Sequence, residues 1–255
     1  MAALVLCSVL LGIAACGGAG EDAEPDSGGS GAATSTQEPP TIAFVGDSVM
    51  DELAEGLVAA LEGQAEVSFI GQSSVAGNLL VPLEWSSRLG TEDPDLVVVL
   101  VGTWEAIAAE YHPGEQAYLD EVAPFLDVVA ERAEVLWLGH PRLQHEAEVT
   151  TDDLNSYWSQ LPERHPGVTF LDAGAALEED GEFRTLLDVD GRQVLVRQID
   201  GRHLCPDGVV LMGRAVLEEL ERRFGLQPAD GWEQGDWRDL GDEERGRLCP
   251  AGLGE

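Results

Sequence analysis

Apolar runs rich in β-branched residues alternate with amphipathic stretches from residue 41 to residue 224, and this alternation constrains the fold most. The clearest run, Asp95–Val101, is bounded by Pro94 and Gly102, as expected of a buried strand. Four other runs have the same character: Thr41–Val45, Val67–Ile70, Glu134–Gly139 and Val168–Asp172. Strands this apolar, separated by helices, predict a mostly parallel sheet covered on both faces.

The amphipathic stretches predict the helices of this α/β domain. After the first strand, apolar residues recur at helical spacing: Val49, Met50, Leu53, Leu57, Val58 and Leu61. Further helices are expected over Glu115–Arg132, with a kink at Pro124, over Asp152–Pro162 and over Pro206–Phe224. We therefore expect a single folded domain over residues 41–224.

The charge balance excludes several classes of partner. The chain has 14 Lys+Arg against 48 Asp+Glu, a formal net charge of −34, which argues against binding to nucleic acids and against adsorption to anionic lipids. Every basic residue is Arg, so mechanisms that need a Lys Schiff base or a phosphate-loop Lys are excluded as well.

The N-terminus reads as a targeting segment. Residues 4–15 form an apolar run of signal-peptide length that is too short to span a bilayer comfortably. The run ends in Ile-Ala-Ala-Cys16, which resembles a bacterial lipobox and makes Cys16 the expected lipid anchor after removal of residues 1–15. An ordinary signal peptide is the alternative.

Residues 16–40 are rich in Gly, Ser, Pro and acids and predict a flexible tether. We expect an exported protein on the outer face of the bacterial cytoplasmic membrane, held there by the lipid anchor only.

Two cysteines remain for the folded part, Cys205 and Cys249. In an oxidising, exported setting this pair predicts a disulfide, whereas a metal site is the weaker alternative because no CxxC spacing is present. Residues 225–255 have no clear periodicity and are expected to pack on the domain as a C-terminal extension. Its tryptophans, Trp232 and Trp237, are expected to fill a groove, with a sugar-stacking surface as the alternative.

Two polar motifs fall where a parallel sheet places its functional site, at the carboxyl ends of strands. Gly46-Asp-Ser48 follows the first strand and precedes a helix, so Ser48 has its N–H at a helix N-terminus, where developing negative charge is stabilised. Asp200-Gly-Arg-His203 precedes the last helix, and a carboxylate beside a His suits general base catalysis. Taken alone, each motif also fits a helix N-cap or a surface loop.

Together the two motifs resemble those of the SGNH, or GDSL, hydrolase superfamily, over most of residues 41–224. The resemblance implies a single flavodoxin-like, three-layer α/β/α sandwich with a mostly parallel central sheet. It also implies Ser48 as the nucleophile, His203 as the general base and then acid, and Asp200 as the carboxylate that orients the His. Asp47 is a structural neighbour in this family, and no cofactor is implied.

In such hydrolases the backbone N–H of the Ser, a Gly and an Asn form the oxyanion hole. Here Ser48 supplies the first donor and Gly77 fits the family's Gly best, with Gly71 as a competitor. The family's GxND block reads GTWE, with Trp104 in place of the Asn. The indole of Trp104 or the amide of Asn78 is the candidate replacement. The GxWE form resembles SGNH domains appended to bacterial membrane acyltransferases, which also tend to carry a Cys after the DxxH His.

The remaining His residues predict no metal site, because His140 and His145 have no third ligand at suitable spacing. His140 and Arg142 follow a strand, so a role in lining the substrate site is a further expectation.

The sequence thus predicts a serine-dependent ester hydrolase that acts on carbohydrate or lipid O-acyl esters and functions as a monomer. An O-acyltransferase that uses the same acyl-Ser48 intermediate is one alternative. A non-catalytic binding protein with this fold is another, suggested by Trp104.

Overall fold

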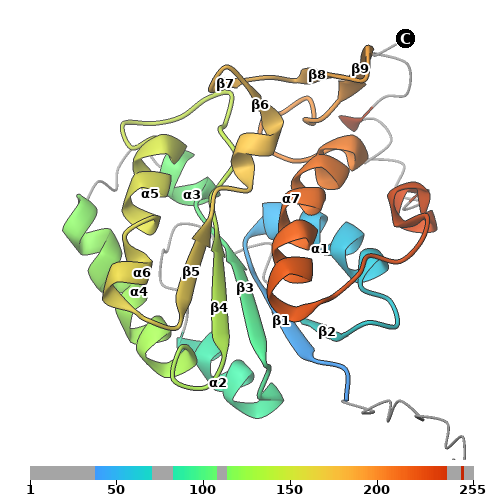
Figure 1. Ribbon diagram of the computed structural model, residues 1–255. Helices are drawn as coiled ribbons and strands as arrows, with labels where there is room; N and C mark the ends of the chain where they lie inside the picture. Colours follow the sequence, from blue (N-terminus) through green and yellow to red (C-terminus); the bar gives the residue numbers. More distant parts are fainter. Residues whose placement is uncertain (1–37, 71–82, 108–113, 240–247, 250–255) are drawn as a thin grey trace, which may run out of the picture. The chain divides into compact units, whose positions relative to one another are not determined.

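The computed structural model describes residues 38–70, 83–107, 114–239 and 248–249. Its centre is a five-stranded, fully parallel sheet with the strand order β2-β1-β3-β4-β5 (Figure 1). The strands are β1 (Thr41–Gly46), β2 (Glu66–Phe69), β3 (Leu96–Leu100), β4 (Glu134–Leu138) and β5 (Val168–Leu171). All five strands that the apolar runs predict are therefore present, and their order is flavodoxin-like.

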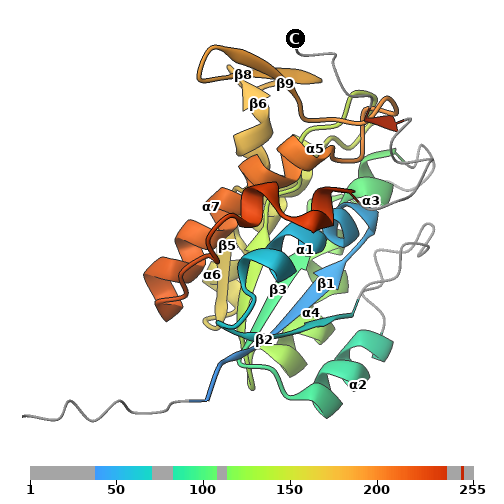
Figure 2. The same ribbon diagram turned by 90° about the vertical axis from the view of Figure 1, so that its right-hand side faces the viewer.

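Helices cover both faces of the sheet, which confirms the predicted α/β/α sandwich (Figures 1 and 2). One face is covered by α1 (Ser48–Ala60) and α7 (Pro206–Phe224). The other face is covered by α2 (Leu83–Glu92), α4 (Glu115–Val129), α5 (Thr151–Trp158) and α6 (Leu161–Arg164). A short helix, α3 (Thr103–Ile107), follows β3 directly.

The inner strands β1, β3 and β4 each supply side chains to two hydrophobic cores. Ile42 and Phe44 of β1 pack with α1 and α7, whereas Ala43 and Val45 pack on the opposite face with α4 and α5. Successive residues of a strand point to opposite faces, so a strand buried on both sides must be apolar at every position. This requirement explains why β1 and β3 are apolar along their buried length, whereas the edge strand β2 alternates polar with apolar residues.

One predicted helix is wrong, because the structure divides Asp152–Pro162 into two. The first, α5, begins with a capping box between Thr150 and Asp153 and ends at Trp158. A new helix, α6, then starts with Pro162 in its first turn. Proline has no N–H to continue a helix but is well suited to begin one, so the break falls just before it.

Two short hairpins between β5 and α7 were not predicted. They are formed by β6 (Glu178–Glu179) with β7 (Glu182–Phe183), and by β8 (Leu186–Val189) with β9 (Arg192–Leu195). Each turn is an Asp-Gly pair in which both residues have positive φ. This dipeptide is a strong hairpin signal when it lies between strand-like residues.

The predicted disulfide is present between Cys205 and Cys249. Closing a loop of 44 residues contributes about 4 kcal/mol to stability in the chain-entropy model. Before it, the helical turns η2 (Trp232–Gln234) and η3 (Asp236–Asp239) lie over α1 and α7. Trp232 is buried there in the same hydrophobic core as α1 and α7, and Trp237 packs beside it.

Three predictions from the N-terminal part lie outside the described residues: the signal peptide, the tether up to residue 37 and the lipid anchor at Cys16. Among the residues that the structure does describe, no helix is long and apolar enough to cross a membrane.

Candidate active site

The two predicted motifs meet beside β1, at the point where the order of the strands in the sheet reverses. From β1 the chain passes through α1 to β2 on one side, whereas β3 lies on the other side of β1. Ligands of open parallel sheets bind at such switch points, beyond the carboxyl ends of the strands. Gly46 ends β1 there, and a Cβ on it would lie 2.2 Å from the carbonyl oxygen of Leu100. Only glycine permits this close approach of β1 to β3.

Asp47 joins the two turns at this switch point. Its buried carboxylate accepts hydrogen bonds from the N–H of Val49 at 3.0 Å, of Gly102 at 3.2 Å and of Thr103 at 3.0 Å. The first bond caps α1, and the other two hold the turn after β3. Asp47 is therefore the structural neighbour that the sequence predicted.

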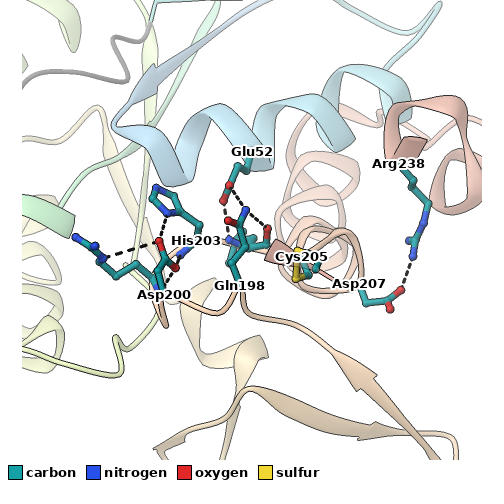
Figure 3. Close-up of a disulfide and its surroundings, with 10 residues drawn as sticks. Glu52, Gln198, Asp200, His203, Cys205, Asp207 and Arg238 are labelled. Atoms are coloured by element: carbon teal, nitrogen blue, oxygen red, sulfur yellow. Dashed lines mark hydrogen bonds and ion pairs between the residues drawn. A yellow bond between two sulfur atoms is a disulfide. The ribbon is translucent and has the colours of Figure 1, made fainter. Parts of the chain in front are cut away.

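Ser48, His203 and Asp200 form one continuous line of hydrogen bonds. Ser48 Oγ lies 2.8 Å from His203 Nε2. His203 Nδ1 lies 2.6 Å from Asp200 Oδ2, and Figure 3 shows this second bond. A carboxylate only accepts hydrogen bonds, so Nδ1 carries the proton and Nε2 is left to accept from the Ser48 hydroxyl. This is the geometry that general base activation of a serine requires.

The backbone of its own turn holds Asp200 in the ionised form. Oδ1 accepts from the N–H of Arg202 at 3.0 Å and of His203 at 3.1 Å. Partial burial raises the pKa of Asp200, but these bonds and the one from the His203 ring outweigh burial, and the pKa is lowered overall. Gly201 has a φ of +68°, which a glycine adopts without strain and which lets the turn close.

Arg197 supports the turn that carries Asp200 and His203, and the sequence did not predict this role. Its fully buried guanidinium donates to the carbonyl oxygens of Arg202 at 3.3 Å and Arg142 at 2.9 Å, and it lies 5.7 Å from the Phe183 ring. Burial lowers the pKa of Arg197 to about 10, so it remains charged at neutral pH. The available signal was a lone Arg within an apolar run next to the DxxH motif.

The expectation that His140 lines the substrate site is wrong, because this side chain is completely buried. Its Nδ1 donates to the carbonyl oxygen of Pro141 at 2.9 Å, so Nε2 accepts from the Thr103 hydroxyl at 2.8 Å. Burial lowers the pKa of His140, which favours this neutral form. Its backbone exchanges two hydrogen bonds with the side chain of Asn155. His140 thus stabilises the turn after β3 through its hydrogen bond with Thr103.

Arg142 remains a candidate for contact with substrate, since its side chain is partly exposed. It pairs with Asp152 at 2.5 Å and lies 3.9 Å from Glu178. The structure has no cluster of three or more potential metal-ligating side chains within the residues it describes.

The oxyanion hole stays a prediction. Ser48 is the first residue of α1, where a helix leaves N–H groups without helical partners. Trp104 lies in the first turn of α3 and is partly buried. Gly71, Gly77 and Asn78 lie outside the described residues. The N–H groups of the two residues before Trp104 already donate to Asp47 and are not available to an oxyanion.

Glu105 is a buried carboxyl beside this turn that the sequence did not single out. Only 7% of its surface is exposed. Burial, with added repulsion from Asp47 and Glu121, raises the pKa of Glu105 to about 7. A protonated carboxyl is thus held next to Trp104 in mildly acidic solution.

Comparison with solved structures identifies the class of fold. The periplasmic domain of a lipopolysaccharide acetyltransferase from Salmonella Paratyphi A is 12% identical, with a TM-score of 0.55, over 72% of this chain and 84% of that one. A GDSL-like lipase from Bacteroides thetaiotaomicron is 13% identical (TM-score 0.52; 72% and 88% covered). An acetylxylan esterase from Geobacillus stearothermophilus is 17% identical (TM-score 0.51; 71% and 94% covered). The chain therefore has the SGNH hydrolase fold.

The family itself follows from the sequence match. Residues 41–219 match the family described as "Protein of unknown function (DUF459)", and the chain belongs to this family. No curated protein matches the chain.

The raised pKa of Glu105 predicts a pH-dependent stability. Between pH 4.5 and about 7 the unfolded chain loses this proton while the folded protein keeps it, so the free energy of unfolding falls across that range and levels off above it. At high pH the folded protein must hold Glu105 as a buried, charged carboxylate, which lowers the free energy of unfolding by up to about 3 kcal/mol. Glu105→Gln removes this loss of stability. Its gain in stability over the wild type should therefore be larger at pH 8.5 than at pH 5, measured by urea unfolding.

The matched control is Glu131→Gln, at an exposed position. It should shift the urea midpoint equally at both pH values. The same result for Glu105→Gln would contradict the raised pKa.

Proposed function

We propose that this protein is a serine-dependent hydrolase of O-acyl esters that works through an acyl-enzyme on Ser48. The observation that carries the proposal is the hydrogen-bonded line from Ser48 through His203 to Asp200. The SGNH fold supports it, because the line lies at the carboxyl ends of β1 and β3. Ser48 and His203 are both partly exposed, so an ester has access to them.

The reaction follows from the proton positions. Ser48 Oγ attacks the ester carbonyl carbon while its proton passes to His203 Nε2, and Asp200 stabilises the imidazolium that forms. His203 then gives the proton to the alcohol oxygen as the bond from that oxygen to the acyl carbon breaks. A water molecule attacks the acyl-serine, its proton goes to His203 and then back to Ser48, and the acid leaves.

The negative charge on the tetrahedral intermediate needs donors at the same strand ends. In this proposal the N–H of Ser48 is one of them, aided by the positive end of the α1 dipole. Gly77 is the proposed second donor, and Trp104 or Asn78 the third.

Replacing Ser48 by Ala should abolish ester turnover. We expect kcat/KM for p-nitrophenyl acetate to fall by at least about 10³-fold, since losing a triad nucleophile removes the covalent route. Labelling by a fluorophosphonate probe should disappear with it.

Ser156→Ala, at an exposed position of α5, is the matched control. It should keep both the ester turnover and the labelling by the probe. A wild-type protein that is neither labelled by the probe nor active on the ester would contradict the proposal. That result would favour a non-catalytic binding protein with this fold, the alternative that Trp104 suggests.

An O-acyltransferase is the second candidate. It is favoured by the GTWE block and by the fold shared with the acetyltransferase domain. Hydrolysis and transfer differ in whether water or a sugar hydroxyl attacks the acyl-serine. When an acetyl donor and an oligosaccharide are supplied together, we expect free acetate to be the main product by mass spectrometry. Acetylated oligosaccharide in excess over acetate would identify a transferase.

The proposed substrates are esters of neutral cell-envelope carbohydrates, with lipid esters as the alternative. The net charge of −34 disfavours polyanions, and one protein with the same fold is an acetylxylan esterase. The proposed location is the outer face of the cytoplasmic membrane, with a lipid on Cys16. The mass of protein purified from bacterial membranes should therefore correspond to a diacylated or triacylated chain that begins at Cys16. An unmodified N-terminus elsewhere would exclude the anchor.

A further inference from the structure

The helix that begins with Ser48 carries a buried carboxylate one turn further on, at Glu52. Its side chain makes short hydrogen bonds to the segment that holds the DxxH motif. Oε1 accepts from Gln198 Nε2 at 2.6 Å (Figure 3). Oε2 accepts from the N–H of Leu204 at 2.6 Å. Only 9% of Glu52 is exposed. One side chain of α1 thus contacts a segment about 150 residues away in the sequence.

These two partners enclose the loop that carries Asp200 and His203. Gln198 lies before the loop and Leu204 after it, and Gln198 Nε2 also donates to the carbonyl oxygen of Leu204 at 3.1 Å. The N–H of Gln198 donates to the carbonyl oxygen of His203 at 2.9 Å. The loop is therefore closed on itself at its base, and Glu52 holds that base.

The arrangement relates the loop to the nucleophile. Ser48 and Glu52 lie about 6 Å apart along the axis of one rigid helix. A bond from Glu52 to each end of the loop therefore fixes where His203 lies relative to Ser48. Burying a carboxylate is costly unless it is hydrogen-bonded, and bonds to an ionised acceptor are the stronger kind.

We propose that Glu52 is a positioning residue, which sets the distance between His203 Nε2 and Ser48 Oγ by holding both ends of the Asp200–His203 loop to α1. This inference rests on the proposed function of Ser48. It assigns no contact with substrate to Glu52.

Glu52→Gln tests it with almost no change in size. One carboxylate oxygen becomes an NH₂ group, which faces a donor and cannot accept, so one of the two bonds is lost. Misplacing a catalytic group by about 1 Å costs on the order of 10²-fold in rate. We therefore expect kcat for p-nitrophenyl acetate, per folded molecule, to fall by about 10- to 100-fold, with KM changed by less than about twofold.

Glu62→Gln is the matched control, because it makes the same chemical change at an exposed residue just after α1. It should leave kcat unchanged. A Glu52→Gln protein that only unfolds more easily, with the wild-type kcat per folded molecule, would overturn the proposal.

Gln198→Met provides a second variant if Glu52→Gln does not fold. It removes the bond to Glu52 Oε1 but keeps that between Glu52 and the N–H of Leu204, so a smaller, several-fold fall in kcat is expected. An unchanged kcat in this variant would also overturn the proposal.

A measurement that does not depend on ester turnover tests the role of Glu52 separately from the proposed function. The Nδ1 proton of His203, bonded to Asp200, should give a low-field proton resonance in the spectrum of the whole protein. We expect this resonance to shift in Glu52→Gln and to stay unchanged in Glu62→Gln. If wild type has no esterase activity but the resonance shifts, the proposed function fails and the role of Glu52 stands. If the wild type is active and the resonance and kcat are both unchanged, the role of Glu52 fails.

Discussion

The carboxylate of Asp47 is the interaction on which the candidate site depends. It caps α1 and at the same time binds the N–H groups of Gly102 and Thr103, so the turns after β1 and β3 are held as one unit. Ser48 is the next residue, and its place at the sheet edge follows from that cap. The close approach at Gly46 and the buried imidazole of His140 support the same pair of turns.

The other half of the candidate site, Asp200 and His203, comes from the C-terminal part of the chain. Asp200 and His203 lie on a loop that begins after two hairpins and ends at the disulfide-bonded Cys205. The buried side chains of Arg197 and Glu52 hold that loop through hydrogen bonds to Arg202 and Leu204. Burying charged groups disfavours folding unless they are fully paired, and proteins tolerate such groups where an exact arrangement serves function.

The predictable parts of the structure were those with a local chemical signature. Consecutive apolar residues predicted the strands, because both faces of the sheet are buried. The motifs around Ser48 and His203 identified the site because their spacing within a turn is local. The break before Pro162 and the two hairpin turns also have local signals, namely the proline itself and the Asp-Gly dipeptides. Glu52 carried none, since an acid one turn after Ser48 looks like any acid on a solvated helix face.

The sequence by itself determined the class of fold, the residue types at the strand ends and the pairing of Cys205 with Cys249. Only the tertiary structure decided which polar residues lie inside. His140, expected from the sequence to lie beside the substrate, is buried and bonds to Thr103, whereas Glu52 and Arg197 bond to the segment that carries Asp200 and His203. The physical reason is that hydrogen bonds between buried groups far apart in sequence depend on how the layers pack. Local patterns of hydrophobicity carry no record of that packing.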